Sequence, residues 1–310
     1  GYNWSMAECP TWDAAFCNVE AALLFKDIYY SMKNKQLPPS IEIDIGFVID
    51  VTGSMSPYAK AAHDTIQNLL VGSGAIVNRL KIGFPKIDFK LRVGTLAFRD
   101  IDDGNDQFDE SMDENGGHFT SNIARSMYDT SELLSDPSGG HDIAEDVFGA
   151  LHRCCSWNNA DDWKAAAKFI IMMTDAPAHG LVPSSSKQIV NADNFAKVHP
   201  SGLTAEKVVE TMLQKDIDLF FCSFNPDATA DTESSLSKAF LELPCNMDGR
   251  DLTSIPMIPK QTMVSGTSIL SHGQCQHIIF VLDESGSMQF EWNGVVVAYQ
   301  NFVAHRLQSQ

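Results

Sequence analysis

Two segments of the chain carry nearly the same sequence, and this repeat restricts the fold more than any other feature. Residues 43–55 read IDIGFVIDVTGSM, and residues 276–288 read QHIIFVLDESGSM. In both, an apolar stretch of strand length leads into Asp, a variable residue, a hydroxyl residue, Gly and Ser. The copies lie much further apart than the repeats of a solenoid protein, so each copy must begin a domain of its own.

The residues between the two copies alternate between short apolar stretches and amphipathic segments. This alternation is typical of an α/β fold, in which helices cover both faces of a parallel sheet. We expect strands at 43–49, 91–98, 168–173 and 217–223, and helices at 58–79, 121–134, 144–156, 204–214 and 232–241. Right-handed crossovers bring the carboxyl ends of parallel strands to one edge of the sheet, where open α/β sheets bind ligands.

The pattern divides the chain into four parts. Residues 1–40 are expected to form a helical extension packed on the outside of the main domain, because apolar residues recur at helical intervals until two prolines interrupt them. Residues 41–245 form the main domain. Residues 246–275 lack periodicity and contain several Pro, Ser and Gly, which is typical of a linker or a strap. Residues 276–310 hold only the first strand and helix of a second domain, so we expect the native protein to continue beyond Gln310 or another chain to complete this unit.

The turn after the first strand presents three oxygen groups at regular spacing. Asp50 ends the strand, Gly53 permits a tight turn, and the hydroxyls of Thr52 and Ser54 can face the same point as the carboxylate. Such a set forms half of a cage for a hard cation. Mg²⁺ is the expected ion, with Mn²⁺ or Ca²⁺ as alternatives. The second copy offers a partial metal site of the same kind at Asp283, Ser285 and Ser287.

This motif resembles the metal-ion-dependent adhesion site of von Willebrand factor A domains. Further segments match it, namely VGTLAFRD at 93–100, SGGHDIAEDV at 138–147 and FIIMMTDAPAHG at 169–180. With them the main domain is similar to the subgroup found in α-kinase-associated and related eukaryotic proteins. The resemblance implies a Rossmann-like α/β fold, with a mostly parallel six-stranded sheet and helices on both faces.

The resemblance also implies two further ligands. In that family, a loop residue before the fourth helix and an Asp at the end of the fourth strand complete the site. The loop residue is assigned here to Asp142, with His141 as the alternative, and the strand residue to Asp175. Adhesive members have Thr in the loop, so a carboxylate at Asp142 should tighten metal binding but make the ion less attractive to a partner's carboxylate. Asp142 can instead serve as the cap of the following helix.

Several neighbouring residues allow two interpretations. Asp100 ends a strand at the same edge, where it can orient a ligand or a water, or form a loop salt bridge with Arg99. Glu145 and Asp146 are interpreted as partners of the helix dipole rather than as ligands. His179 is interpreted as a loop residue bonded to backbone, because no second His or Cys stands at ligand spacing.

Charge, apolar runs and cysteine content indicate which partners and which compartment suit the protein. The chain has 22 Lys and Arg against 40 Asp and Glu, a net charge of −18, so nucleic acid is a poor partner. No apolar run approaches the length of a membrane-spanning helix, and membrane insertion is not expected. Seven Cys is an odd number, and Cys154 and Cys155 are neighbours on an expected helix, where they cannot readily bridge. This favours a cytoplasmic protein with reduced thiols, with an extracellular protein as the alternative.

The expected function is metal-dependent binding of another protein, whose exposed Asp or Glu completes the shell of the ion. Enzymatic activity is not expected within these residues. Aspartyl phosphotransferases need a second acid two positions after the first, where this chain has Thr52 and, in the repeat, Ser285. Neither a phosphate-binding loop nor a GxSxG turn is present. Two alternatives remain: a regulatory or targeting part of a larger α-kinase-like enzyme, and a structural unit of a larger assembly with a non-functional metal site.

Overall fold

The computed structural model describes residues 39–72, 75–83, 85–183, 192–197, 199–243 and 267–270. The predicted helical extension therefore lies outside the described residues, apart from its last two positions. The same holds for the second copy of the motif, with Asp283, Ser285 and Ser287, and for most of the predicted linker.

A single six-stranded sheet forms the centre of the described part, in the order β3-β2-β1-β4-β5-β6. Its strands are β1 (Ser40–Asp50), β2 (Asp88–Phe98), β3 (Phe108–Glu110), β4 (Ala167–Thr174), β5 (Asp218–Ser223) and β6 (Thr267–Leu270). The four central strands are parallel, whereas β3 and β6 pair antiparallel at the two edges. The expected α/β class is confirmed, and the sheet is mixed because its edge strands reverse direction.

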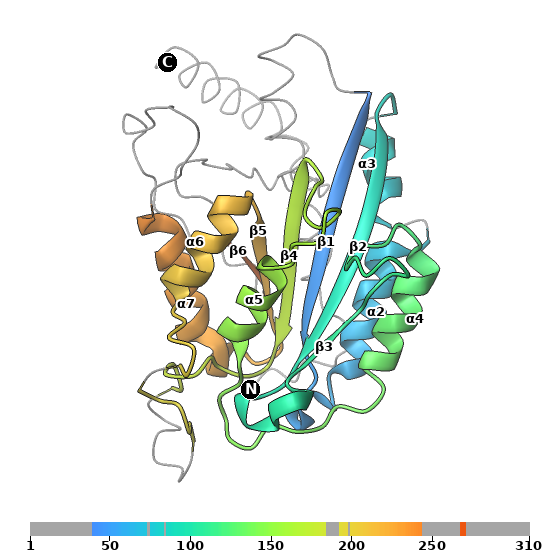
Figure 1. Ribbon diagram of the computed structural model, residues 1–310. Helices are drawn as coiled ribbons and strands as arrows, with labels where there is room; N and C mark the ends of the chain where they lie inside the picture. Colours follow the sequence, from blue (N-terminus) through green and yellow to red (C-terminus); the bar gives the residue numbers. More distant parts are fainter. Residues whose placement is uncertain are drawn as a thin grey trace, which may run out of the picture. The chain divides into compact units, whose positions relative to one another are not determined.

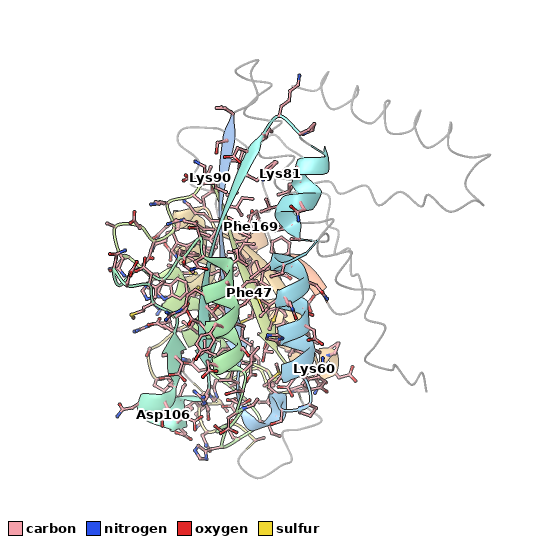
Figure 2. All side chains as sticks on the ribbon, turned by 90° about the vertical axis from the view of Figure 1, so that its right-hand side faces the viewer. Phe47, Lys60, Lys81, Lys90, Asp106 and Phe169 are labelled. Carbon is pink, nitrogen blue, oxygen red and sulfur yellow. The ribbon has the colours of Figure 1, made fainter. Side chains whose placement is uncertain are left out.

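Helices cover both faces of the sheet (Figure 1). On one face, α2 (Ala59–Leu70), α3 (Ile76–Gly83) and α4 (Ile123–Leu133) pack against a core that includes the inward side chains of β1. On the other, α5 (Val147–Cys155), α6 (Ala205–Lys215) and α7 (Pro226–Glu242) enclose a second core. Phe47 and Phe169 belong to the first of these cores, between the sheet and the helices, and both are buried. Both are labelled in Figure 2, together with Lys60 on the outer side of α2. Strand β1 is apolar on both faces because it lies between two strands and two helical layers.

Some helix boundaries differ from those expected. The single helix predicted at 58–79 is wrong: Val71 is extended and Gly72 has a φ of +91°, so the chain turns between α2 and α3. Helix α7 begins at Pro226, well before residue 232, because proline is well suited to the first helical position. Helix α5 begins only at Val147, where the Asp146 side chain caps it by accepting a hydrogen bond from the amide of Gly149.

Two further findings bear on the sequence expectations. Among the helices that the structure describes, none combines the length and the apolar character that crossing a membrane requires. Cys154 and Cys155 are buried and form no disulfide. Burial raises the pKa of both thiols, to about 12 at Cys155, so they are protonated and unreactive at neutral pH.

Candidate metal centre

Asp50 stands at the carboxyl end of the central strand and is fully buried. Its Oδ1 accepts hydrogen bonds from the amide of Thr52 at 3.0 Å and from the Thr52 hydroxyl at 2.7 Å. Its Oδ2 accepts one from the hydroxyl of Thr174, at the end of β4, at 2.8 Å. These three donors fix the orientation of the carboxylate.

A chain of hydrogen bonds connects Asp50 to three other predicted ligands. The hydroxyls of Thr52 and Ser54 lie 3.1 Å apart, and the Ser54 hydroxyl donates to Oδ1 of Asp175 at 2.8 Å. Asp175 follows β4, which runs parallel to β1, so both strands end at the same edge of the sheet. The structure thus brings together Asp50, Thr52, Ser54 and Asp175. Thr52 is buried and Ser54 is exposed, so the cluster opens to the surface at Ser54.

The loop at 138–140 closes over this turn. The amide of Gly53 donates to the carbonyl of Gly139 at 3.2 Å, and the amide of Ser138 donates to the carbonyl of Val51 at 2.8 Å. Gly140 has a φ of +76°, and a Cβ built there would lie 2.6 Å from Oε1 of Glu145. A side chain at Gly140 would therefore collide with Glu145, and only glycine lets the loop pass this close.

Glu145 is a residue of the centre that its sequence position did not reveal. Its interpretation as a partner of the helix dipole is wrong, because it precedes the cap of α5 and is only 3% exposed. A hydrogen bond of 3.0 Å from its amide to the carbonyl of Pro177 fixes it to the loop after β4. Its Oε2 is buried and has no hydrogen-bond partner among the described residues. A buried carboxyl oxygen without a partner is costly unless a cation or a proton satisfies it.

The electrostatics of the centre indicate a lack of positive charge. Burial, and then the nearby Asp50 and Asp100 carboxylates, raise the pKa of Glu145 to about 10. Burial, together with the nearby charge of Asp175, raises the pKa of Asp50 to about 6. Burial also raises the pKa of Asp175. A divalent cation would supply the missing charge. The donors are all hard oxygens, which fit Mg²⁺, Mn²⁺ or Ca²⁺.

Asp142, the loop residue assigned as a ligand, forms its hydrogen bonds elsewhere. Its Oδ1 accepts from the amide of Ala144 at 2.8 Å and its Oδ2 from the amide of Asn194 at 2.6 Å. It does not cap α5, which Asp146 does. The alternative ligand, His141, is exposed, and its Nε2 lies 3.6 Å from a carboxylate oxygen of Asp103.

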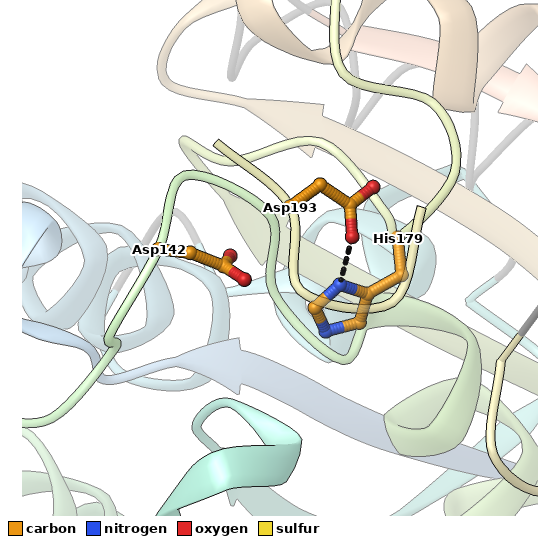
Figure 3. A group of neighbouring side chains, drawn as sticks. All are labelled: Asp142, His179 and Asp193. Atoms are coloured by element: carbon orange, nitrogen blue, oxygen red, sulfur yellow. Dashed lines mark hydrogen bonds and ion pairs between the residues drawn. The ribbon is translucent and has the colours of Figure 1, made fainter. Parts of the chain in front are cut away.

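Asp142 instead lies beside His179 and Asp193 (Figure 3). The sequence-based interpretation that the His179 ring bonds to backbone is wrong. Its Nε2 is 2.7 Å from Oδ1 of Asp100, and its Nδ1 is 2.9 Å from Oδ1 of Asp193. Asp100 is fully buried and also accepts from the amide of Ile101, so it holds a histidine rather than Arg99. Asp193 follows no sequence pattern that could have identified it.

Comparisons with known proteins give limited similarity. No protein-family model matches the chain. "Alpha-protein kinase vwkA" of Dictyostelium discoideum is 25% identical over 207 residues, which are 66% of this chain and 29% of that protein. The chain thus spans less than a third of the length of this curated relative.

Two crystal structures of the pilus adhesin SpaC from Lactobacillus rhamnosus GG also match. One, in an open conformation, is 16% identical with a TM-score of 0.38, over 65% of this chain and 26% of the adhesin. The other is 15% identical with a TM-score of 0.40, over 65% and 27%. These scores are too low to define the fold.

Proposed function

We propose that residues 41–245 form a von Willebrand factor A-type domain that binds another protein through a divalent cation, with Mg²⁺ as the preferred ion. The observation that carries this proposal is the hydrogen-bonded series of Asp50, Thr52, Ser54 and Asp175 at the carboxyl edge of the parallel strands. The similarity to a protein named vwkA supports it as well.

Five side chains would hold the ion. Asp50 and Asp175 contribute carboxylates, Thr52 and Ser54 contribute hydroxyls, and Glu145 takes the loop position that the sequence assigned to Asp142. When bound, the cation supplies a positive centre that attracts an oxygen ligand from outside the protein. The exposed position of Ser54 indicates the side from which a partner's Asp or Glu would approach.

The net charge of the chain restricts the partner. At −18, the chain repels a strongly acidic protein at long range, while the cation attracts a carboxylate at short range. We therefore propose a partner of basic or mixed charge that presents one exposed acid.

The similarity to an α-protein kinase favours a second, compatible role. The residues would then form a regulatory or targeting part of a larger kinase-like protein, with catalysis carried out by residues outside this chain. Partner binding would recruit the kinase to its target or position it there.

Calorimetric titration of the 310-residue chain with Mg²⁺ tests the metal centre directly. We expect Asp50→Asn to weaken binding at least about tenfold, because a carboxylate ligand loses its charge. Asp136→Asn, which removes an exposed acid outside the centre, should leave binding unchanged. Equal affinity for the wild type and Asp50→Asn would refute the proposed centre.

Capture of partners from a cell lysate, with EDTA or with Mg²⁺, then tests the role of the ion. Partners that bind only with Mg²⁺, and only to the wild type, would support metal-dependent recognition. Partners that remain bound in EDTA would instead support a structural assembly unit.

A further inference from the structure

Beside the proposed centre, a buried histidine is surrounded by three carboxylates from separate parts of the chain. Asp100 follows β2, Asp142 lies in the loop before α5, and Asp193 lies in the segment between β4 and α6. One ligand atom from each of Asp142, His179 and Asp193 can be chosen so that all lie within 4.8 Å of one another. Figure 3 shows the Asp142 carboxylate and the Asp193 carboxylate on different sides of the His179 ring.

The charges of this cluster do not balance. The side chains of His179, Asp100 and Asp193 are 1%, 0% and 5% exposed. Within the described ranges, Asp100 and Asp193 form ion pairs with His179 alone, and neither pairs with Lys or Arg. Three carboxylates therefore share at most the single positive charge of an imidazolium. Buried acids in excess of their counter-charges are costly, so the site is suited to a further cation.

A second observation also points to a ligand. Oδ2 of Asp100 is buried and has no hydrogen-bond partner in the described part of the chain, although Oδ1 of the same carboxylate contacts His179. Native proteins rarely leave a buried carboxylate oxygen unpaired, and a cation bound in this cluster would compensate its charge.

Backbone amides hold the two outer carboxylates in place. Asp193 accepts from the amides of Gly180 at 2.6 Å and Phe195 at 2.9 Å. Asp142 accepts from the amides of Ala144 at 2.8 Å and Asn194 at 2.6 Å. Each carboxylate oxygen has two lone pairs, so these bonds orient the groups and leave lone pairs for a metal.

We propose that Asp142, His179 and Asp193 form a second cation site, separate from the centre at Asp50 and selective for a divalent transition metal such as Zn²⁺. One imidazole and two carboxylates suit Zn²⁺, whereas Mg²⁺ prefers oxygen ligands. Two ligands of a tetrahedral Zn²⁺, each at about 2.1 Å, lie about 3.4 Å apart, so the three ligand atoms, which lie within 4.8 Å of one another, have to move closer together when the ion binds. The ion replaces the proton on the ring nitrogen that it binds, and this proton passes to solvent.

Such an ion would link two loops that border the first centre. Asp142 belongs to the loop that carries Gly140 and Glu145, and Asp193 belongs to the segment that contacts Gly180. Zn²⁺ would therefore fix the loop that presents Glu145, without itself contacting the partner. The proposed function does not depend on this site, and each can fail without the other.

Titration of the 310-residue chain with Zn²⁺, in saturating Mg²⁺ to compete for the Asp50 centre, tests the inference. We expect His179→Gln and Asp193→Asn each to weaken Zn²⁺ binding at least about tenfold, while Asp50→Asn leaves it unchanged. His199→Gln is the matched control, because it removes another buried histidine, for which the described part of the chain provides one carboxylate partner, Asp146 at 2.7 Å. This control should bind Zn²⁺ as the wild type does.

Absorption of the Co²⁺-substituted chain provides a readout that does not depend on affinity. Tetrahedral coordination at the His179 site should give Co²⁺ a stronger visible absorption than an octahedral site of oxygen ligands does, and this strong absorption should be lost in His179→Gln and retained in His199→Gln. Asp193→Asn keeps the shape of the side chain, so it provides the test if His179→Gln does not fold. Three results would overturn the proposal: no Zn²⁺ binding by the wild type, unchanged binding in folded His179→Gln or Asp193→Asn, or loss of binding in Asp50→Asn.

Discussion

Replacing Glu145 with Gln removes the acid whose ionisation is most strongly opposed in the metal centre. Glu145 is 3% exposed, and burial followed by Asp50 and Asp100 raises its pKa from 4.5 to about 10. At pH 7 without a cation, Glu145 is therefore protonated in the folded protein and ionised in the unfolded chain. Folding must take up this proton, and Gln has nearly the shape of the protonated acid without that requirement.

The size of the effect follows from the ordinary pKa alone. Protonating a carboxyl of pKa 4.5 at pH 7 costs about 3 kcal/mol. This cost does not depend on the pKa of Glu145 in the folded protein as long as that pKa stays above 7. The folded state binds more protons than the unfolded state, so the stability of the wild type falls as pH rises from 4.5 towards 10. In EDTA at pH 7, Glu145→Gln should be more stable than the wild type by up to about 3 kcal/mol. The difference should disappear near pH 4.

Urea unfolding followed by circular dichroism, at several pH values in EDTA and in Mg²⁺, measures this difference. Glu132→Gln, on the exposed side of α4, is the control and should show no such pH dependence. In Mg²⁺ the wild type should gain more stability than Glu145→Gln, because the cation then satisfies Glu145. If Glu145→Gln is less stable than the wild type at pH 7 in EDTA, Glu145 is primarily a structural residue and the argument fails.

Two further variants, Asp50→Asn and Gly140→Ala, test the same centre, and Gly104→Ala is the control for the second. Because the pKa of Asp50 is raised from 3.8 to about 6, Asp50→Asn in EDTA should be more stable than the wild type by up to about 3 kcal/mol above pH 6, and equal to it below pH 4. Thermal unfolding at several pH values measures this difference. If Asp50 mainly supports the fold, Asp50→Asn will be less stable than the wild type above pH 6. Gly104→Ala places a side chain on a residue with a φ of +63°, where the added Cβ has no atom within 4 Å, so only backbone strain of about 1–3 kcal/mol is expected. Gly140→Ala adds the clash with Glu145, so a larger loss of stability and weaker Mg²⁺ binding by calorimetry are expected; equal losses would argue against that contact.

Much of the fold and part of the centre were predictable from sequence because the determining interactions are local. An apolar strand that ends in Asp50 can be buried on both faces only at the middle of a parallel sheet. The hydroxyls of Thr52 and Ser54 lie on the turn that follows, so their approach to Asp50 depends on residues adjacent in the chain. Asp175 joins them because β4 is the parallel neighbour of β1, and its assignment as a ligand came from the family resemblance rather than from a local pattern.

Tertiary structure alone decided which acid of the loop before α5 faces the centre. Asp142 and Glu145 lie on the same short loop, and their chemistry is nearly the same. The left-handed conformation of Gly140 and the pairing of Glu145 with Ala178 turn Glu145 inward. Asp142 is held outward by the amide of Asn194. These contacts join segments that no local pattern relates.

Contacts between distant segments also explain why the cluster around His179 and the edge strands of the sheet were not predicted from sequence. The two acids that bond its ring are 79 and 14 positions away in sequence, so the surroundings of this histidine could not be read from spacing. Strands β3 and β6 are short and pair only through the backbone of a neighbouring strand, so they too left no apolar pattern. Local periodicity fixes which segments are strands and helices, whereas the side chains that meet between distant loops depend on the folded chain as a whole.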